Sequence, residues 1–598
     1  MTIDTHSAPS RLTGAGTVAG IALGAAERYE GDALTAPGAE PISYAELGKA
    51  AQEIAGGLAE LGIQRGDHVA ILAGTRPEWT LADFGALCAG ATVVPIYQTN
   101  SPEECQYILE HAGVRAVVCE DAGQVAKVEQ VRDRCPALEH VIVMEGTVPG
   151  AVSLAELRER GDATGEAVVA ERLAQVGPRD VATIVYTSGT TGPPKGCVIT
   201  HSSLLATVAM YVRELGLRDS RMVIYLFLPL AHSLARVAQL ATLDAGGTLA
   251  FWGGDPTKIV EELAEARPTH FPSVPRIYEK LHTAVLGGVA EQSRLKQAIF
   301  RWAVREGGRA RAATRAGDKS GRVAAARHRL ADRLVLEKVR GVFGDRLAVA
   351  LCGAAPIGKE VLEFFDACGV LILEGYGMTE TCAAATLNTP RTVRFGTVGK
   401  PLPGTEVAIA EDGEILMAGP HVFAGYHRNP EATEEVMEDH WLRSGDLGEL
   451  DSDGFLRITG RKKDLIITSS GKNISPENIE CALRETRWIS NAVVAGDRRS
   501  YLVALVTLDS DEAPKLAAKL GIPAEVASMA ADERVHAALQ RDVDAVNERF
   551  ARIEQIKRFD ILDHDLSQAE GELTPTLKVK RPVIYARHAD RFDRLYAP

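Results

Sequence analysis

Two kinds of hydrophobic pattern alternate over the chain from about residue 17 to residue 270. Stretches with helical spacing of apolar residues are separated by short apolar, β-branched runs at 68–74, 91–97, 115–120 and 140–145. Runs without polar alternation are typical of strands that are buried on both faces. The pattern therefore predicts parallel sheets with helices on both sides.

The pattern changes in the rest of the chain. A stretch at about 281–340 is rich in Ala and Arg, which form helices well, and we interpret it as a basic helical insertion with a Gly/Asp break in its middle. The α/β pattern resumes at 346–356, and short strands with Gly turns follow around 411–426. Two further apolar strands are expected at 491–497 and 501–509.

These patterns predict an α/β protein with two domains, since 598 residues exceed what one hydrophobic core usually serves. Residues 1–462 are expected to form a large N-terminal domain of parallel-rich sheets covered by helices, with a small β region. Residues 463–598 are expected to form a small α+β C-terminal domain.

Charge and cysteine content narrow the function. The formal net charge is -14, which disfavours nucleic acid as a partner and requires a local basic site for any anionic substrate. The nine cysteines contain no metal-binding spacing and indicate a reducing compartment. The first residues show no secretory signal, and the chain has no run of about 18 apolar residues. A cytoplasmic protein is expected, and peripheral membrane contact stays open.

The segment IVYTSGTTGPPKGCVITH, residues 184–201, leads from an apolar run into a loop of Gly, Ser and Thr that closes on Lys195. Small residues let backbone N–H groups and hydroxyls surround an anion, and the lysine adds a positive charge. The loop is not a Walker A motif, because Gly196 follows Lys195 and the glycine spacing differs. From composition alone, a flexible surface turn is an equal alternative.

The segment resembles the phosphate loop of the adenylate-forming superfamily, and further motifs follow in the family's order: FLPLAHSLAR (227–236), LCGAAP (351–356) and EGYGMTET (374–381). The resemblance implies that His232 lies beside an acyl pocket and acts in catalysis with Lys195. It makes Glu380 the magnesium ligand and Tyr376 the residue that stacks on adenine. The nucleotide contacts that it implies in these motifs are Thr187, Ser188, Gly189, Thr190, Thr191, Gly192, Lys195, Gly353, Ala354, Ala355, Glu374, Gly375, Tyr376, Gly377 and Thr379.

Three later motifs extend the resemblance. WLRSGDLG (441–448) implies that Asp446 holds the ribose hydroxyls, although such an Asp is otherwise most often a turn residue. GRKKDLIITSSGKNISPENIE (460–480) implies that Arg461 lies near the phosphates and that Lys463 is the hinge; alone it would be a solvated basic turn. ELTPTLKVKRPVI (572–584) implies that Lys578 is the catalytic lysine, where a basic tail would be the plain alternative.

The resemblance covers about residues 20–590 and includes features of the long-chain fatty acyl-CoA synthetases: VPRIYEKL (274–281), the basic insertion, EQIKRFDIL (554–562) and the TPTLKVKR ending. It implies a ligase that uses ATP, Mg²⁺ and coenzyme A to activate a fatty acid through an acyl-adenylate. Free CoA is the expected acceptor, because only 20 residues follow Lys578. The alternatives are an acyl-AMP ligase that loads a carrier protein, a non-catalytic binding protein and a luciferase-like oxygenase.

The insertion supports two interpretations. Between 294 and 333 basic residues greatly outnumber acidic ones, and Leu295, Ile299 and Trp302 share a helical face. The segment is either a solvated helical arm or a surface that touches anionic lipid. The acyl chain length and the residues of the acyl tunnel cannot be derived from the sequence. The oligomeric state also stays open, with a homodimer as one option.

Overall fold

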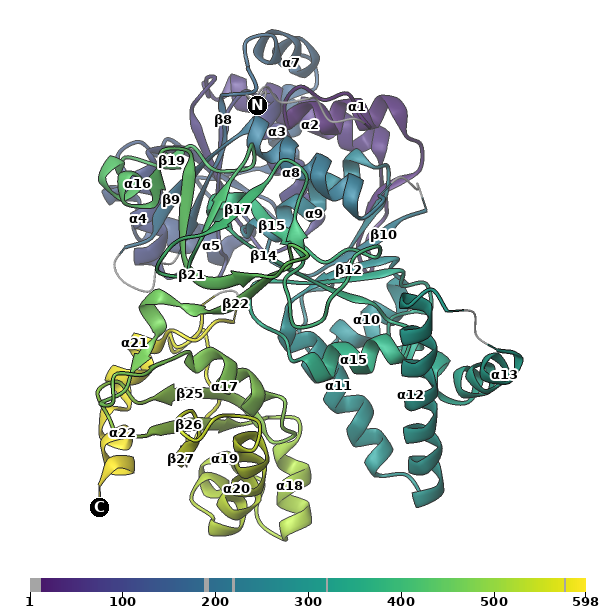
Figure 1. Ribbon diagram of the computed structural model, residues 1–598. Coiled ribbons are helices and arrows are strands. Elements are labelled where there is room, and N and C mark those ends of the chain that lie inside the picture. Colours follow the sequence, from purple (N-terminus) through teal and green to yellow (C-terminus); the bar gives the residue numbers. More distant parts are fainter. Residues whose placement is uncertain (1–11, 188–192, 218–220, 319–320, 575–576, 598) are drawn as a thin grey trace.

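The computed structural model describes residues 12–187, 193–217, 221–318, 321–574 and 577–597. Three large sheets and their helices form the N-terminal part of the chain. A smaller sheet with its own helices forms the C-terminal part, which is yellow and light green in Figure 1.

The first sheet is parallel in its middle. In spatial order its strands are β19 (Gly425–Tyr426), β9 (Lys195–Thr200), β8 (Val181–Thr187), β4 (Thr92–Ile96), β3 (His68–Leu72), β5 (Val114–Cys119), β6 (His140–Val143) and β7 (Val152–Ser153). Strand β3 pairs in parallel with β4 and β5, so that His68 lies opposite Thr92 and Val114. The four apolar runs predicted as strands are thus present as β3, β4, β5 and β6.

The second sheet is also parallel in its middle and ends in antiparallel strands. In spatial order its strands are β16 (Lys400–Pro401), β15 (Ala383–Leu387), β14 (Ile372–Met378), β13 (Val349–Cys352), β12 (His270–Ser273), β10 (Val223–Leu226), β11 (Thr248–Phe251), β1 (Asp32–Thr35) and β2 (Ile42–Ser43). The strand predicted at 346–356 is β13.

The third sheet is antiparallel and corresponds to the expected small β region. Its strands are β17 (Glu406–Ile409), β18 (Glu414–Ala418), β21 (Trp441–Leu450), β20 (Met437–Glu438) and β22 (Leu456–Arg461), which pairs with β21. The hairpin of β21 and β22 places Asp446 opposite Arg461.

Helices cover both faces of the first two sheets, as predicted. Val69 and Ile71 of β3 face the helices between the sheets, whereas Ala70 and Leu72 face the outer helices. The helices between the sheets are α1 (Ala19–Arg28), α2 (Tyr44–Glu60), α3 (Pro77–Cys88), α8 (His201–Glu214) and α9 (Ser233–Asp244). The outer helices are α4 (Pro102–Ala112) and α5 (Ala122–Glu129) on the first sheet, and α10 (Ile259–Ala266), α11 (Pro275–Ala290) and α15 (Lys359–Ala367) on the second. Three short helices complete this part: α6 (Leu154–Gly161), α7 (Gly165–Leu173) and α16 (Pro430–Val436).

The predicted insertion is helical. It consists of α12 (Arg294–Arg315), α13 (Arg322–Ala331), a π-helical turn (Asp332–Leu336) and α14 (Glu337–Gly341). The break expected in its middle separates α12 from α13. Trp302 of α12 packs against the core of the second sheet, while Leu295 is 71% exposed. In Figure 1 this segment projects away from the sheets on the right.

The C-terminal part is an α+β unit. The short pair β23 (Ile466–Ile467) and β24 (Asn473–Ile474) leads into a sheet of β25 (Ile489–Ala495), β26 (Leu502–Leu508) and β27 (Ile556–Ile561). One face is covered by α17 (Pro476–Arg484), α18 (Ala513–Leu520), α19 (Val526–Ala530) and α20 (Glu533–Asn547), the other by α21 (Arg581–Arg587) and α22 (Ala589–Tyr596). Alternate residues of β26 reach the two cores, as a strand buried on both faces requires.

Polar contacts join the two parts. Arg276 of α11 donates to Asp509 and to Ser490 at 2.8 Å each, and Lys280 donates to Asp511 at 2.9 Å. Arg276, Lys280, Asp509 and Asp511 line a cleft of about 130 Å³ between α11 and the C-terminal part. The contacts fix one arrangement of the two parts.

All nine cysteines are free thiols buried in the protein. Burial raises the pKa of each thiol above its ordinary value. No helix within the described ranges is both long enough and apolar enough to cross a membrane.

Candidate active site

A hairpin of β8 and β9 carries the predicted phosphate loop. Thr187 ends β8 and lies opposite Lys195, which begins β9, and the Thr187 hydroxyl donates to the Lys195 carbonyl at 3.4 Å. The two strands thereby hold the ends of the loop together. The loop residues Ser188, Gly189, Thr190, Thr191 and Gly192 lie outside the described residues.

Tyr426 lies between Lys195 and the buried carboxylate of Glu380. The Lys195 ammonium lies 5.0 Å from the centre of the Tyr426 ring, and the Tyr426 hydroxyl donates to Glu380 Oε1 at 2.6 Å. Glu380 is only 7% exposed and lies on the turn that follows β14. Burial first and the charge of Glu380 second raise the pKa of the Tyr426 hydroxyl. The turn thus presents a fixed carboxylate next to the end of the phosphate loop.

A second group of side chains comes from strands β14, β21 and β22. Tyr376 donates its hydroxyl to Asp446 Oδ2 at 2.7 Å, and Arg461 Nε lies 3.4 Å from Asp446 Oδ1. Burial raises the pKa of Asp446, and the guanidinium of Arg461 opposes this shift. The aromatic ring and the carboxylate are thereby held in one orientation, which suits a nucleoside that needs a flat surface and an acceptor for its hydroxyls.

Close packing of the backbone forms the wall beside Tyr376. A side chain at Gly377 would place its Cβ 1.7 Å from the Ala383 carbonyl oxygen, so only glycine allows β14 and β15 to pair here. Gly375 is similarly confined by Leu387. The turn Gly353–Ala355 follows β13, and Ala354 adopts φ +73°, a left-handed conformation that is strained for a residue with a side chain.

Glu374 and Thr379 flank this wall at the two ends of the predicted motif. Glu374 is 9% exposed, and burial raises its pKa to about 8, so the carboxyl is mostly protonated at neutral pH. Thr379 is half-buried at the start of the turn that carries Glu380.

Lys578 reaches the same site from the C-terminal part. Burial first and the charge of Arg461 second lower the pKa of its ammonium, while Glu477 and Asp446 oppose the shift. The residue itself is exposed to solvent, so protein surrounds the ammonium on some sides only. Within the described part of the chain the ammonium has no hydrogen-bond or ion-pair partner. The charges of Arg461, Asp446 and Glu477 therefore act on an ammonium that no described residue binds.

His232 stands at the start of α9, and Leu234 of the same helix lines a small apolar cavity. His232 caps α9, its Nδ1 accepts from the Leu234 N–H at 3.2 Å, and burial first and Lys578 second lower its pKa to about 4. The imidazole is therefore neutral at physiological pH. The cavity of about 10 Å³ is lined by Tyr211, Leu215, Leu217, Ile224, Leu234, Ala238, Ala241, His270, Pro272 and Leu351.

The structure thus brings together most of the predicted residues whose positions it describes. Lys195 and Glu380 form one side of the site, Tyr376 and Asp446 the other, and Arg461 acts electrostatically on residues of both sides. Lys463 lies apart from these side chains, exposed on the short 3-10 turn between β22 and β23, where the chain passes into the C-terminal part.

Sequence motifs missed three residues of this arrangement. Tyr426 contacts Lys195 only because β19 pairs with β9. No residue spacing in the sequence predicts this pairing. Glu477 faces Lys578 from α17, and Arg276 joins the two parts of the chain. Arg276 lies within the VPRIYEKL segment, which the sequence analysis singled out. Its partner Asp509 could not be predicted from that motif.

Comparison with known proteins decides the family. Residues 24–427 match the AMP-binding enzyme family, and residues 463–598 match the AMP-binding enzyme C-terminal domain. The chain is 37% identical over 561 residues to the long-chain-fatty-acid–CoA ligase FadD15 of Mycobacterium bovis, covering 93% of this chain and 92% of that protein. The chain belongs to the long-chain acyl-CoA synthetases of the adenylate-forming superfamily.

Other long-chain acyl-CoA synthetases and solved structures agree. The long-chain-fatty-acid–CoA ligase ACSBG2 of Gallus gallus is 35% identical, over 90% of this chain and 75% of its own. The anthranilate CoA ligase AuaEII, solved with anthranoyl-AMP, superposes with a TM-score of 0.74 at 20% identity, over 96% of this chain and 97% of its own. A Mycobacterium tuberculosis fatty acyl CoA synthetase superposes with a TM-score of 0.61 at 22% identity, over 96% and 99%. These structures confirm the predicted fold class.

Membership of this family confirms several predictions. This acyl-CoA synthetase is an enzyme, and the family uses ATP with Mg²⁺ and takes CoA as co-substrate. A fatty acid and CoA are therefore its small-molecule substrates. The oxygen donors at Glu380 suit Mg²⁺, which usually takes one or two carboxylates together with substrate phosphates.

Proposed function

We propose that this synthetase joins a long-chain fatty acid to coenzyme A in two steps. The fatty carboxylate attacks the α-phosphate of ATP, the bond to pyrophosphate breaks, and an acyl-adenylate forms. The CoA sulfur then attacks the acyl carbonyl, and AMP leaves. The observation that carries this proposal is that Arg461 lies 3.4 Å from Asp446 of the Tyr376–Asp446 pair, the charges of Arg461 and Asp446 act on Lys578, and Lys195 lies beside Tyr426 and Glu380.

Charge repulsion explains why three cations are useful here. The first step brings two anions together at a phosphorus centre, and preorganised cations stabilise the negative charge that develops. We assign Lys578 and Lys195 to this role and Arg461 to the phosphates. Magnesium bound by Glu380 with the phosphates would supply further neutralisation.

The remaining site residues are assigned to binding. Tyr376 would stack on adenine beside the wall of Gly353, Ala354 and Ala355, and Asp446 would accept from the ribose hydroxyls. Neutral His232 would lie where the fatty carboxylate enters. Further backbone and side-chain contacts to the nucleotide are proposed for Thr187, Ser188, Gly189, Thr190, Thr191, Gly192, Glu374, Gly375, Gly377 and Thr379.

We propose that residues 1–462 and 463–598 act as two domains that rotate about Lys463. The rotation would withdraw Lys578 after the first step and open a path for CoA. The exposure of Lys463 between β22 and β23 and the polar character of the contacts between the two parts support this proposal.

The small apolar cavity that Leu234 lines is the proposed entrance to the acyl tunnel. At about 10 Å³ it is too small for an acyl chain, so the side chains around it must move when the substrate enters. Burying each CH₂ is worth about 0.8 kcal/mol, which favours acids of roughly 12 to 18 carbons over acetate.

The test of this function is pyrophosphate release over fatty acids from short to very long, with and without CoA. Palmitate should far exceed acetate in kcat/KM, and acyl-CoA should form at the rate at which adenylate is consumed. Equal values for the two acids would refute a long-chain substrate. Adenylate that accumulates untouched by CoA would instead indicate an acyl-AMP ligase that loads a carrier protein.

The cavity offers a sharper test of chain length. Ala238 is 6% exposed on α9 and lines the cavity, so Ala238→Phe should fill it and lower kcat/KM for palmitate much more than for a medium-chain acid. Ala235→Val, also on α9 but outside the cavity lining, is the matched control for helix packing. An equal loss with both acids would mean that the cavity is not the tunnel.

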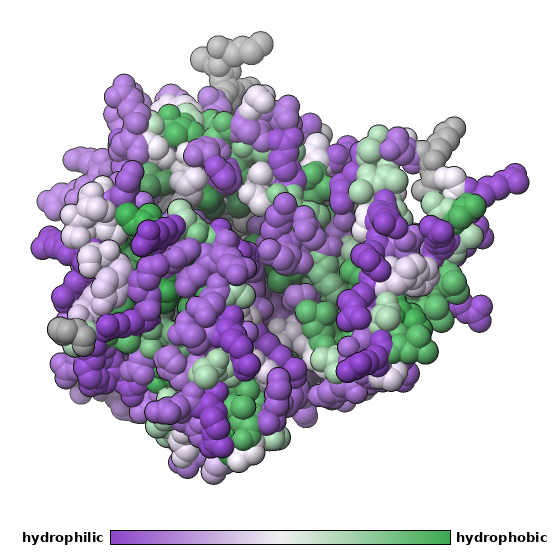
Figure 2. Space-filling model, turned by 60° about the horizontal axis from the view of Figure 1, so that its bottom comes forward, coloured by the Kyte–Doolittle hydropathy of each residue, from purple (hydrophilic) through white to green (hydrophobic). Residues whose placement is uncertain are grey.

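We further propose a cytoplasmic enzyme that touches anionic membranes through the insertion. Exposed apolar side chains lie there among many arginines, and Figure 2 shows apolar surface within a hydrophilic rim on this projection. Arg311 and Arg315 point inward to Asp366, so they would not contribute to membrane contact. The exposed apolar residues of the insertion are Leu295, Val323, Leu330 and Leu334, and Leu286 of α11 is also exposed.

Flotation with anionic vesicles tests the membrane contact. Binding should fall with salt and with Leu295→Glu, while activity on detergent-dispersed fatty acid stays unchanged. Binding that is insensitive to both would leave the insertion as a solvated arm. Sedimentation of the same samples without vesicles would distinguish a homodimer from a monomer.

A further inference from the structure

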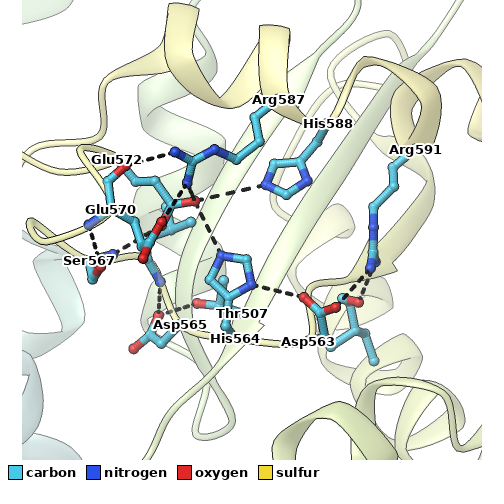
Figure 3. A network of polar contacts seen from close by, with 12 residues as sticks. Thr507, Asp563, His564, Asp565, Ser567, Glu570, Glu572, Arg587, His588 and Arg591 are labelled. Carbon is cyan, nitrogen blue, oxygen red and sulfur yellow. Dashed lines mark hydrogen bonds and ion pairs between the residues drawn. The ribbon is translucent and has the colours of Figure 1, made fainter.

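A cluster of metal-ligating side chains lies in the C-terminal part, on the side of its sheet that carries α21 and α22 (Figure 3). It consists of His564, Glu572 and His588, and one ligand atom of each lies within 4.8 Å of the others. His564 Nε2 is 3.2 Å and His588 Nε2 is 4.0 Å from Glu572 Oε1. The cluster uses none of the residues assigned to catalysis.

These separations fit a small tetrahedral metal ion. Zinc binds imidazole nitrogen and carboxylate oxygen at about 2.0–2.2 Å, so two ligand atoms of a tetrahedral site lie about 3.3 Å apart. The His564–Glu572 distance already has this value, the His588–Glu572 distance of 4.0 Å is somewhat longer, and the two histidine ligand atoms lie within 4.8 Å of each other. Two histidines and one carboxylate leave a fourth position for water.

The contacts around the cluster direct one nitrogen of each histidine toward Glu572. His564 Nδ1 donates to Asp563 Oδ1 at 2.8 Å, and its Nε2 shares a hydrogen bond of 3.2 Å with Glu572 Oε1, so a metal ion would take the place of the Nε2 proton. His588 Nε2 is buried and has no hydrogen-bond partner within the described residues. A metal ion would satisfy all three atoms, and Asp563 would orient His564 as carboxylates commonly orient metal-binding histidines.

Arg587 is the competitor for this position. It donates to Glu572 Oε1 at 2.8 Å, and Arg591 binds Asp560 and lies 3.6 Å from Asp563. The acidic groups around the cluster nevertheless outnumber these two arginines: Asp560, Asp563, Glu570 and Glu572. The surroundings can therefore accept a divalent cation.

We propose that His564, Glu572 and His588 bind a divalent transition metal, with Zn²⁺ as the preferred ion. Imidazole ligands select such metals over Mg²⁺ and Ca²⁺, which prefer oxygen. The site is separate from the magnesium position assigned to Glu380.

The metal would stiffen the loop that carries Lys578. The Glu572 carbonyl accepts from the Lys580 N–H at 2.8 Å, and Leu573 pairs with Val579 just inside that bond. Glu572 therefore anchors the base of the loop, and a metal ion would fix this base to the junction of α21 and α22 and to the segment after β27. This consequence, unlike the metal site itself, rests on the function proposed for Lys578.

Equilibrium dialysis of the full-length, tag-free protein against Zn²⁺, without nucleotide, tests the site directly. Wild-type protein should retain one Zn²⁺ more per chain than His588→Ala or His564→Ala, with at least 10-fold weaker binding in each variant. His140→Ala is the matched control, because His140 also lies near a carboxylate, at 3.8 Å from Glu139. Co²⁺ should show the absorption of a tetrahedral site in wild type and in His140→Ala but not in His564→Ala or His588→Ala.

Replacement of the competing cation distinguishes a metal site from a plain ion-pair network. Arg587→Gln should bind Zn²⁺ more tightly, and Zn²⁺ should raise its melting temperature. Circular dichroism checks that each variant is folded. Equal zinc retention in wild type, His564→Ala and His588→Ala would overturn the proposal, whatever the activity of the enzyme, and so would an Arg587→Gln variant that gains no affinity.

Discussion

The two sides of the active site are built differently. On the N-terminal side Tyr376 is bonded to Asp446 and Tyr426 to Glu380, and these residues come from strands and turns packed into the main core. On the C-terminal side Lys578 stands on a loop held by backbone contacts, such as the one from the Thr574 N–H to the Lys578 carbonyl at 2.8 Å. A rigid wall suits a group that is bound throughout the reaction, and a movable lysine suits one that is needed in a single step.

The largest effect should come from the movable side. Lys578→Ala removes one preorganised cation, and we expect a loss of about 2.7–4 kcal/mol in the adenylation transition state, roughly 100-fold to 1000-fold in rate. Thioester formation from synthetic acyl-AMP and CoA should hardly change. Pyrophosphate release and acyl-CoA formation, measured separately, test this difference.

Lys580→Ala is the matched control for that experiment. It removes a lysine from the base of the same loop but keeps the backbone bond to Glu572. If Lys578→Ala lowered the rates of both half-reactions to a similar extent, the proposed difference between the two sides of the site would be wrong. An unaffected adenylation step would show that Lys578 is not the catalytic lysine.

Substitutions on the N-terminal side of the site should affect both half-reactions, and not adenylation alone. Asp446→Ala removes a charged acceptor, worth about 1.5–3 kcal/mol, and we expect roughly 10-fold to 100-fold losses in both half-reactions because AMP is held in each. Tyr376→Phe removes only the hydroxyl that orients Asp446 and should cost a few-fold. A loss confined to one half-reaction would contradict a fixed nucleotide wall.

The contacts between the two parts should have a smaller effect. Arg276→Gln removes a partly buried ion pair to Asp509, and we expect about a 3-fold to 10-fold slower adenylation with unchanged or faster thioester formation. Lys280→Gln, whose pair with Asp511 is exposed, should stay within about 2-fold. Stopped-flow measurement of each half-reaction checks both. If Arg276→Gln slowed both steps equally, Arg276 would stabilise the fold as a whole and not the one arrangement of the two domains that serves adenylation.

The smallest effect concerns stability at the rigid wall. The pKa of Glu374 is about 8 in the folded protein and ordinary in the unfolded chain, so this residue lowers stability as pH rises from about 4.5 to about 8. Glu374→Gln cannot ionise and should lose less of its melting temperature than wild type between pH 6 and pH 9. Parallel curves for the two proteins would mean that Glu374 is ionised in the fold.

The sequence predicted the parallel sheets because strands buried on both faces leave long apolar runs, as in β3 to β6. It could not predict the order of the strands, because β8 joins β4 and β19 joins β9 through pairings set by the whole core. In the insertion the sequence placed Leu295 and Trp302 on one helical face. Only the structure shows that Trp302 meets the core while Leu295 stays exposed.

The site divides in the same way. Tyr376, Asp446 and Lys578 stand in short motifs, and resemblance to the family was enough to select them. The role of Tyr426 could not be predicted from the sequence, because its contact with Lys195 depends on two strands that are distant along the chain. Contacts that depend on tertiary packing leave no local spacing in the sequence.

The burial of every cysteine has a consequence for an enzyme whose co-substrate is a thiol. An accessible thiolate would exchange with oxidised CoA and form a mixed disulfide, whereas nine inaccessible thiols with raised pKa values resist this reaction. The enzyme can therefore work in a mixture of CoA and CoA disulfides without forming mixed disulfides at its own cysteines. For the same reason, a chromogenic thiol reagent added to the native enzyme should report the CoA that remains, with little background from the protein.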